Sequence, residues 1–288
     1  MSGKLGEIEA RIAATHQLEA VVGAMRGIAA ARSHDAHAKL AGIRACAAAA
    51  GAAIGDVLAF DPSGVPARAA NADDGPEACV VIGAEQGFVG GLNDRIAEEV
   101  LGGARERVRH WLLVGTRLVN ACAERGLTGT WSAPMAAHPA GVPHLAARVS
   151  DALYARLADG ERATRVTVTH ALPGESRMRI VQRTLIPFDF ARFHVTPRAL
   201  PPLVNVAPAR LLGGLVELYV SLELCEALML SFAAENEARV RAMLAARSNV
   251  RERLAGLSQQ YRAMRQDEIT SEIVELSTGR EATQRAMI

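Results

Sequence analysis

Both ends of this 288-residue chain are long, proline-free stretches with helical periodicity. The first runs from Ser2 to about Phe60, and the second from Arg210 to Ile288. Apolar or small residues recur in both at steps of three and four, which is the period of one helix face. Helices of globular domains rarely exceed about 25 residues. Two such helices in one chain are therefore predicted to pack on each other as an antiparallel coiled coil.

The middle of the chain has a different pattern. Turn formers in "FDPSGVPARAANADDGPEA" mark a linker after the first helix, and proline-rich "VTPRALPPLVNVAPAR" precedes the second. Between them, helical patterns alternate with strand candidates: "EACVVIGA", "HWLLVG", "RATRVTVTHAL" and "SRMRIVQRTLIPFDF". This alternation is typical of an α/β domain with a mainly parallel sheet. We predict an α/β fold in which a Rossmann-like domain (residues 61–208) is inserted between coiled-coil helices over residues 1–60 and 209–288.

Composition argues against several classes of protein. The formal net charge is +1, which is too small a basic excess for binding nucleic acid or a membrane surface by charge. The longest apolar stretch contains three carboxylates, Glu217, Glu223 and Glu226, which argue against a membrane helix there. Acidic residues near the amino terminus argue against a secretory signal. The sequence predicts a soluble chain that reaches a membrane only through a partner.

Cysteine and histidine positions give no sign of a metal or redox centre. The four cysteines have no pairing rhythm, which favours a reducing compartment, and Cys46 and Cys225 fall at expected seam positions as small hydrophobic residues. His34 and His37 lie one helical turn apart, but no third ligand accompanies them. We expect no cofactor, no metal and no catalytic residue in this chain.

A glycine-rich stretch, "IGAEQGFVGGLND", joins the first strand candidate to a helix and allows two interpretations. As a phosphate-binding loop it lacks both the G-x-G-x-x-G spacing and the P-loop lysine. As a structural turn it uses Gly87, Gly90, Gly91 and Asn93, with Gly90 and Gly91 permitting close packing. The first interpretation keeps open a free-standing nucleotide-binding enzyme that uses the loop from Gly83 to Gly91 and dimerises through its helical arms. A helical scaffold with static partners is a third class.

The second long helix is unusually basic in its middle. From residue 239 to residue 265 it carries a single carboxylate, Glu252, against seven arginines: Arg239, Arg241, Arg247, Arg251, Arg253, Arg262 and Arg265. A solvated helix face is one explanation of such a run. The other is a surface that binds carboxylates of a partner, because guanidinium groups bind carboxylates in several geometries and stay charged.

Four stretches, in order along the chain, resemble the gamma subunit of F-type ATP synthases. The tail is similar to the family's RQ-x-x-IT-x-E-[LI]-x-E-[IL]-x-x-G-x-x-A at Arg265, Gln266, Ile269, Thr270, Glu272, Ile273, Glu275, Leu276, Gly279 and Ala282. "AENEARVRAMLAARSNV" resembles SE-x-x-AR-M-x-AM-x-AAT-x-NA at Glu235, Ala238, Arg239, Ala242, Met243, Ala245, Ala246 and Asn249. "EQGFVGGLND" resembles DRGLCGGLN at Gly87, Gly90, Gly91, Leu92 and Asn93, and "VVGAMRGIAAAR" resembles IT-x-AM-x-x-VAASK at Ala24, Met25, Ala29 and Ala30.

The resemblance covers essentially the whole chain, but it includes departures from the family pattern. Gln86 stands where arginine is usual and Glu85 where aspartate is usual, while Gly27, Ser33 and Arg247 are atypical. These differences indicate a divergent branch, such as one from an alternate ATPase operon.

The resemblance implies a non-catalytic rotor shaft that couples ion-driven rotation of a membrane ring to ATP synthesis or hydrolysis. Its expected partners are the alpha and beta subunits around the coiled coil, and the epsilon subunit and c-ring at the foot. The complex would lie on the cytoplasmic side of a bacterial inner membrane. The expected contacts with beta subunits are Arg262, Arg265, Gln266, Thr270, Arg239, Met25 and Arg26.

Overall fold

A computed structural model describes residues 2–60, 75–103, 105–158, 163–174, 178–195 and 204–285. It confirms the two long terminal helices, α1 (Ser2–Phe60) and α5 (Pro208–Arg285). Proline is absent from α1 and stands in α5 only at its first residue, Pro208, where its missing N–H breaks no helical bond. The predicted linker after α1 falls largely on residues 61–74, which lie outside the described residues.

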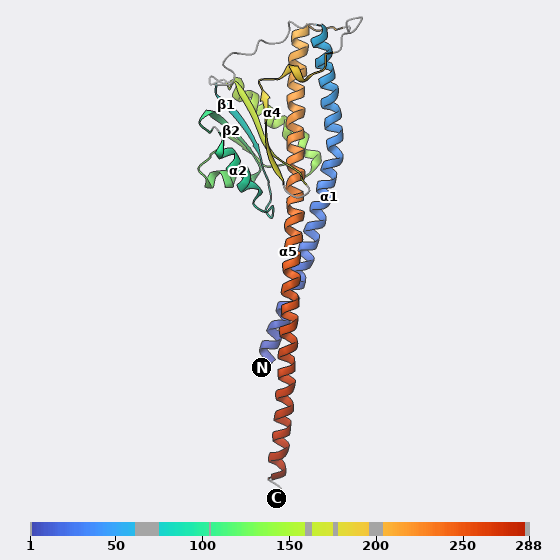
Figure 1. Cartoon of the computed structure of the whole chain (residues 1–288), viewed down its shortest axis with the longest axis vertical. Helices are drawn as coiled ribbons and strands as arrows, with labels where there is room; N and C mark the ends of the chain where they lie inside the picture. Colours follow the sequence, from blue (N-terminus) through green and yellow to red (C-terminus); the bar gives the residue numbers. More distant parts are fainter. Residues whose placement is uncertain are drawn as a thin grey trace. The chain divides into compact units, whose positions relative to one another are not determined.

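The middle of the chain forms an α/β domain, shown in Figure 1. Its strands are β1 (Glu77–Ile82), β2 (Val108–Val114), β3 (Trp131–Ala133), β4 (Arg165–Leu172) and β5 (Arg179–Ile186). Its helices are α2 (Leu92–Gly102), α3 (Thr116–Glu124) and α4 (Val142–Ala158), with single 3₁₀ turns at Arg105–Arg107, Pro139–Gly141 and Phe190–Arg192. The sheet order is β3-β2-β1-β4-β5, and only the edge strand β5 is antiparallel to its neighbour. The expected mainly parallel sheet is confirmed.

Both faces of the sheet are buried, as a mainly parallel sheet requires. Alternate residues of β1 point to opposite faces. Val80 and Ile82 join a core with Leu145 of α4 and Leu228 of α5. Cys79 and Val81 join a second core that contains Ile96 of α2 and Leu118 of α3, together with Ala234 and Ala238 of α5. The sheet therefore separates two layers, and α5 contributes to both cores.

The chain divides into two compact units. The coiled-coil unit comprises Met1–Ile28 with Val240–Ile288, and the sheet unit comprises Ala29–Arg239. The contacts thus group parts of both long helices with the sheet, whereas the sequence pattern predicted an inserted domain over residues 61–208. The reason is packing: Ala36 and Leu40 of α1 belong to the same core as the strands.

Within the coiled-coil unit the two helices run antiparallel. Tyr261 Oη donates to Glu9 Oε1 over 2.6 Å, and Arg251 Nε donates to Glu19 Oε1 over 2.9 Å. Ten residues forward on α1 thus correspond to ten residues back on α5. Buried side chains of α5 recur every seven residues, at Met243, Val250 and Leu257, which is the heptad spacing of a coiled-coil seam.

Among the described helices, α1 from Lys4 to Phe60 is long and apolar enough to cross a membrane, with a window of mean hydropathy 1.5. Alanine supplies much of this apolarity, as in "RACAAAAGAA". A helix that packs inside a protein can have the same length and hydropathy. Ala29, Ala36 and Ile54 of α1 are at most 1 % exposed. The finding is therefore weak evidence for a membrane span.

Candidate functional site

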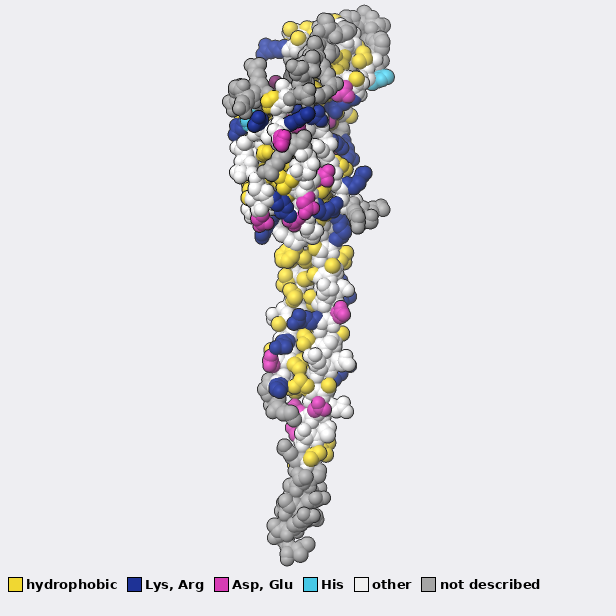
Figure 2. Space-filling view, turned by 60° about the vertical axis from the view of Figure 1, so that its left-hand side comes forward, with side chains coloured by type: hydrophobic (Ala, Val, Ile, Leu, Met, Phe, Trp, Pro, Cys, Tyr) yellow, Lys and Arg dark blue, Asp and Glu magenta, His cyan; other side chains and the backbone are white. Residues whose placement is uncertain are grey.

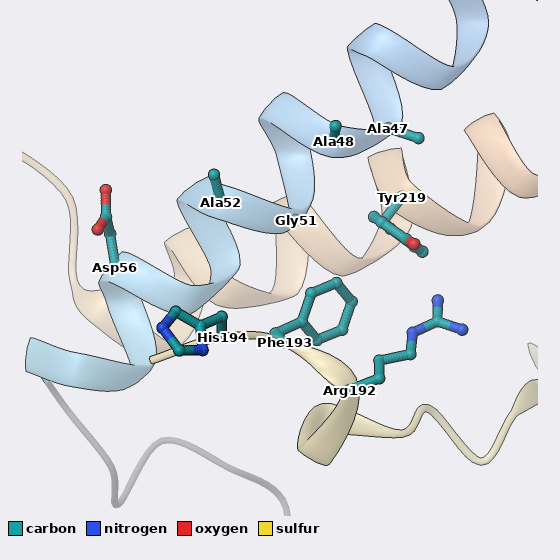
Figure 3. A pocket seen from close by; sticks show the side chains of 9 residues that line it. All are labelled: Ala47, Ala48, Gly51, Ala52, Asp56, Arg192, Phe193, His194 and Tyr219. Carbon is teal, nitrogen blue, oxygen red and sulfur yellow. The ribbon is translucent and has the colours of Figure 1, made fainter. Parts of the chain in front are cut away.

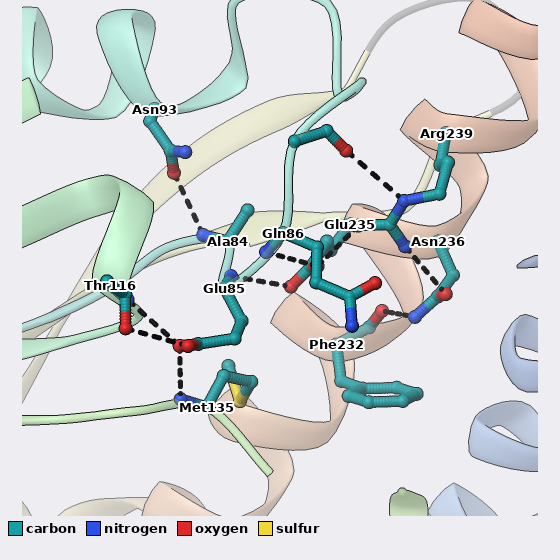
Figure 4. Close-up of polar contacts among 11 residues, drawn as sticks. Ala84, Glu85, Gln86, Asn93, Thr116, Met135, Phe232, Glu235, Asn236 and Arg239 are labelled. Carbon is teal, nitrogen blue, oxygen red and sulfur yellow. Dashed lines mark hydrogen bonds and ion pairs between the residues drawn. The ribbon is translucent and has the colours of Figure 1, made fainter. Parts of the chain in front are cut away.

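The carboxyl ends of three parallel strands meet at the side chain of Glu85, in the loop after β1 (Figure 4). The Thr116 backbone N–H and hydroxyl, both following β2, donate to this carboxylate over 2.9 and 2.7 Å. The Met135 N–H, following β3, donates to it over 2.9 Å. Burial by itself raises the pKa of Glu85, but these hydrogen bonds outweigh it and hold the pKa below its ordinary value. One carboxylate therefore ties three loops together.

A second carboxylate, Glu235 of α5, binds the same loop from the other side. Its two oxygens accept hydrogen bonds from the backbone N–H groups of Glu85 and Gln86, over 3.1 and 3.2 Å. Arg239, one turn further along α5, donates to Glu235 over 2.6 Å and to the Gly87 carbonyl over 3.3 Å. The Glu235 and Arg239 side chains are 5 % and 6 % exposed. Each charge of this buried pair is thus neutralised by the other and by polar backbone groups.

This geometry bears on the phosphate-binding interpretation of the glycine-rich loop. In open α/β sheets, ligands bind in the crevice beyond the carboxyl ends of the strands, where loop N–H groups face the anion. Here the N–H groups of Glu85 and Gln86 already face an anion of the same chain, the Glu235 carboxylate. The position that a ligand phosphate takes in such folds is filled by α5.

The glycines of the loop act differently from the expectation. Gly90 and Gly91 have positive φ, +59° and +75°, but a Cβ on either would meet nothing within 4 Å. The prediction that they permit close packing is therefore wrong, and backbone conformation is what requires them. Close packing occurs at Gly83, where a Cβ would lie 2.6 Å from Leu118 Cβ, and at Gly115, where it would lie 2.7 Å from the Gly83 carbonyl oxygen.

The other two predicted turn residues, Asn93 and Gly87, contribute to the loop through hydrogen bonds. Asn93 is buried, and its Oδ1 accepts a hydrogen bond from the Ala84 N–H over 2.8 Å, which fixes the start of the loop. Gly87 has an ordinary φ, and a Cβ there would make only an ordinary contact with Arg117 at 4.0 Å, so its contribution is the carbonyl that Arg239 binds. The polar partner of the loop, Glu235, was a motif match in the sequence without an assigned role.

The residues expected to contact beta subunits lie in different settings. The side chains of Arg262, Arg265, Gln266 and Thr270 are exposed on α5 in the coiled-coil unit, and Arg265 and Gln266 are adjacent. Thr270 Oγ1 donates to the Gln266 carbonyl within the helix. Met25 and Arg26 on α1 are partly exposed. Arg239 differs from the expectation, because it is 5 % exposed and its guanidinium binds groups of its own chain.

Two more members of the arginine run are used inside the chain. Arg251 and Arg247 of α5 lie 2.9 and 3.5 Å from the same oxygen of Glu19 on α1. The hydrogen bond from Arg251, above all, holds the pKa of Glu19 below its ordinary value. Part of the run therefore pairs the two helices, and Arg253, Arg262 and Arg265 are exposed, as Arg251 is.

A groove of about 800 Å³ lies in the sheet unit between α1 and the segment after β5 (Figure 3). One wall is a row of small residues on α1, including Ala48, Gly51 and Ala52. The opposite wall carries Arg192, whose guanidinium lies 4.7 Å from the Tyr219 ring centre and pairs with Glu223 over 3.1 Å. This arginine is thus held by its own chain, and the lining is that of a packing surface.

The four cysteines divide into three that are buried and one, Cys46, that is exposed. Burial raises the pKa of Cys79 and of Cys122 to about 11, so both are thiols at neutral pH. Cys225 is buried in the main core as expected, but Cys46 is exposed, which corrects its assignment to the seam. His37 Nε2 lies 3.6 Å from Glu237 of α5. The described residues contain no group of three or more potential metal ligands.

Comparison with known proteins identifies the family. A family model described as ATP synthase matches residues 4–283. The gamma chain of Bdellovibrio bacteriovorus is 23 % identical over 290 residues, which cover 96 % of this chain and 98 % of the relative. The chain belongs to the ATP synthase gamma-chain family. It is 32 % identical to the gamma chain of Nitratiruptor sp. over 108 residues, and 33 % identical to that of Helicobacter pylori strain P12 over 106 residues.

Each of those two alignments covers 35 % of the relative, so the chain spans about a third of the length of these gamma chains at that level of identity. Solved structures agree in fold over a greater length. A chain of the Euglena gracilis mitochondrial ATP synthase (OSCP/F1/c-ring, rotational state 3) has a TM-score of 0.67 at 13 % identity, over 98 % of this chain and 95 % of that chain. A chain of the rotor of the same enzyme, in rotational state 1, has a TM-score of 0.64 at 14 % identity, over 93 % of this chain and all of that chain.

Proposed function

We propose that this gamma-family chain is the central shaft of an F-type ATP synthase or ATPase. It couples rotation of a membrane ring to ATP synthesis or hydrolysis at sites on other subunits, and carries no catalytic residue itself. The observation that carries the proposal is the exposure of apolar side chains near the carboxyl end of α5. Ile269, Ile273 and Leu276 are 48 %, 60 % and 73 % exposed there, at the three- and four-residue spacing of one helix side.

Exposed apolar side chains on one helix side are costly in water, and a series of them marks a contact surface. Space-filling Figure 2 shows hydrophobic side chains alternating with charged ones along the coiled-coil unit. Leu18, Val21 and Leu244 are further examples, each about half exposed. An apolar sleeve around the coiled coil would cover them, and a ring of alpha and beta subunits is the sleeve that the family provides.

A shaft can change the catalytic sites only by contacting them differently in different orientations. Moving a site between two states from 1:99 to 99:1 takes about 5.5 kcal/mol of differential contact energy. Such an energy has to be spread over many contacts. Arg262, Arg265, Gln266 and Thr270, together with Met25 and Arg26, are the proposed contacts with beta subunits; Arg239 supports the shaft from inside.

The epsilon subunit and the c-ring are the proposed partners of the sheet unit. The chain is then a peripheral part of a membrane-associated complex, and we place that complex on the cytoplasmic side of a bacterial inner membrane. The family resemblance and the reducing environment that suits four free cysteines support this location.

The test is co-expression of the chain with the alpha and beta subunits of its own genome, followed by ATP hydrolysis measurements on the purified complex. We compare the full chain, a chain without residues 266–288, and a chain with Ile269, Ile273 and Leu276 changed to glutamine. A complex whose turnover depends on this chain and falls in both variants supports the shaft. A chain that stays alone in solution while alpha and beta assemble without it would overturn the proposal.

The beta-contact residues are tested in the same complex. Arg262→Gln, Arg265→Gln and Gln266→Ala are combined in one chain, and Arg253→Gln serves as a control that removes an exposed arginine of the same helix. Reduced torque and hydrolysis in the triple variant, with the control unchanged, supports these contacts. Unchanged torque and hydrolysis in the triple variant refutes them.

A further inference from the structure

Three polar side chains of α5 face the sheet at successive turns of the helix. Ser231, Glu235 and Arg239 are four residues apart, and they are 1 %, 4 % and 5 % exposed. Side chains four residues apart lie on one side of a helix, above one another. These three residues, named here the polar stripe, form a line along α5 that is buried within the sheet unit.

The polar stripe binds backbone groups at successive points of β1 and its following loop. Ser231 Oγ donates to the Ile82 carbonyl over 3.3 Å. Glu235 accepts from the N–H groups of Glu85 and Gln86, and Arg239 donates to the Gly87 carbonyl. The order along α5 therefore matches the order along the strand and loop. Every partner in the strand and loop is a backbone group, so these bonds do not use the side chains of the loop (Figure 4).

Apolar side chains of α5 pack on both sides of the polar stripe. Leu228 and Phe232 lie in the core shared with β1 and α4, and Ala234 and Ala238 lie in the core beside α2 and α3. The hydrophobic contribution of these contacts is non-directional. Hydrogen bonds are directional, and they weaken steeply when the donor angle is lost. A line of directional bonds therefore adds a specific restraint on the rotation of α5 about its own axis against the sheet.

The loop itself shows that the bonds hold a demanding conformation. Phe88 directly follows the bound segment and is 66 % exposed. Its φ is 61°, a backbone conformation that residues other than glycine rarely adopt. Strained residues persist where the surroundings determine the backbone. Gly87, whose carbonyl Arg239 binds, directly precedes Phe88.

The position of the polar stripe along the chain matters for a shaft. Arg239 is the last residue of the sheet unit in α5, and Val240 begins the coiled-coil unit. Torque that passes along α5 from the sheet unit to the coiled-coil unit passes through the helix turns that carry Ser231, Glu235 and Arg239.

We propose that Ser231, Glu235 and Arg239 form a rotational lock between α5 and the inserted α/β domain. The proposal rests on the proposed shaft function and goes beyond it. It assigns these residues as positioning residues, which touch no substrate, and it states that torque transfer depends on their bonds to the loop backbone.

The experiment uses the whole membrane complex in lipid vesicles, with wild-type chain or with Glu235→Gln. Three quantities are measured: ATP hydrolysis, uptake of protons and of Na⁺ per ATP, and hydrogen exchange at the amides of Glu85 and Gln86. The change neutralises the carboxylate that both amides bind, so we expect their exchange to rise by about tenfold. We also expect ion uptake per ATP to fall while hydrolysis continues, because rotation at the catalytic sites is no longer held to the domain at the foot.

Glu237→Gln is the matched control: it makes the same substitution on the same helix, at a residue that contacts Ser33 and His37 of α1. It should leave ion uptake per ATP unchanged. A double variant, Glu235→Gln with Arg239→Met, removes the unpaired buried charge and so separates stability from positioning. The lock predicts low ion uptake per ATP in this variant as well, whether or not the single variant folds.

The outcomes separate the two proposals. Failure of the wild-type chain to assemble with alpha and beta subunits refutes the shaft, and the lock with it. Assembly with normal ion uptake per ATP in the double variant, while the two amides exchange faster, refutes the lock alone. Lowered uptake in the Glu237→Gln control would also refute it, since the effect would then not depend on the polar stripe.

Discussion

The helix α5 carries ion pairs of opposite character in the two units. In the sheet unit, Arg239 and Glu235 are 2.6 Å apart, with side chains 6 % and 5 % exposed. In the coiled-coil unit, Arg251 and Glu19 are 2.9 Å apart, with side chains 59 % and 24 % exposed. The first pair also binds loop backbone, whereas the second joins two helices at the surface.

This difference follows the work assigned to each unit. A buried pair tolerates no loss of a partner, so it fixes one arrangement of loop and helix. In an exposed pair, water can replace either partner, so the pair contributes little to stability. The sheet unit is thus built to keep one geometry, and the coiled-coil unit keeps a surface of charges and apolar side chains that can meet changing neighbours.

Removing the carboxylate of each ion pair should give the largest difference in stability between the two units. Glu235→Ala leaves Arg239 buried without its counter-charge, and we expect a loss of about 3–5 kcal/mol of unfolding free energy. Urea unfolding followed by tryptophan fluorescence measures it, since both tryptophans, Trp111 and Trp131, belong to the sheet unit. Glu19→Ala should leave the far-ultraviolet dichroism melt at wild-type temperature. Equal effects of the two changes would contradict the comparison.

Two leucines of α5 test packing in the same way. Leu228 is fully buried in the main core, so Leu228→Ala should cost about 2–5 kcal/mol through lost burial and a residual cavity. Leu244 is 47 % exposed in the coiled-coil unit, and Leu244→Ala should change stability by no more than about 0.5 kcal/mol. Urea midpoints of both variants give the values, and a large loss for Leu244→Ala would indicate that the isolated chain already covers this side chain.

Within the sheet unit, two glycine-to-alanine substitutions distinguish the effect of steric crowding from the effect of a positive φ. A Cβ at Gly115 would combine a φ of 105° with backbone oxygens at 2.7 and 2.8 Å, so Gly115→Ala should cost about 2–3 kcal/mol. Gly91 has a φ of 75° in open space, and Gly91→Ala should cost about 1 kcal/mol. The reverse order in urea unfolding would show that crowding at Gly115 relaxes easily.

Acid should weaken the sheet unit through His170. This residue is fully buried on β4, and its Nε2 has no hydrogen-bond partner among the described residues. Burial lowers the pKa of His170 from 6.5 to about 4, against a hydrogen bond to the Ala171 carbonyl that raises it. Between these two pKa values the unfolded chain binds the proton and the folded chain does not. Stability therefore falls as pH decreases through this window.

The expected loss from His170 is about 2 kcal/mol between pH 7 and pH 5. Tryptophan-detected urea unfolding across this range measures it, and His170→Gln should flatten the profile. Glu85, whose pKa is lowered, loses its contribution at lower pH, as the carboxylate takes up a proton. The same slope in wild type and His170→Gln would mean that other groups carry the pH dependence.

The long helices and the mainly parallel sheet could be predicted from sequence because their signals are local. Proline absence and three- and four-residue periodicity act within each helix, and apolar runs mark β1, β2 and β4. The strand β3 has three residues, Trp131–Ala133, with Pro134 directly after it, too short for a periodic pattern. It forms because parallel pairing with Leu112, Leu113 and Val114 is available beside it.

The settings of Glu235 and Arg239 could not be predicted, since they depend on residues about 150 positions away. In sequence, Arg239 is one member of an arginine run and looks like the exposed Arg262. Its burial follows from the loop after β1 meeting this turn of α5. The packing role of the glycines was mispredicted for a related reason. Backbone φ and crowding around Cα depend on the folded structure, so the sequence does not distinguish Gly90 from Gly83.

The antiparallel pairing has a consequence for synthesis on the ribosome. Glu19 is translated 232 residues before its partner Arg251. At about 5–20 residues per second, the first helix waits roughly 10 to 50 seconds for the surface it will pack against. During that time a leucine-rich seam would attract other nascent chains. The many alanines of α1 bury little area each, so a newly made α1 can remain unpaired at low risk of aggregation until α5 emerges.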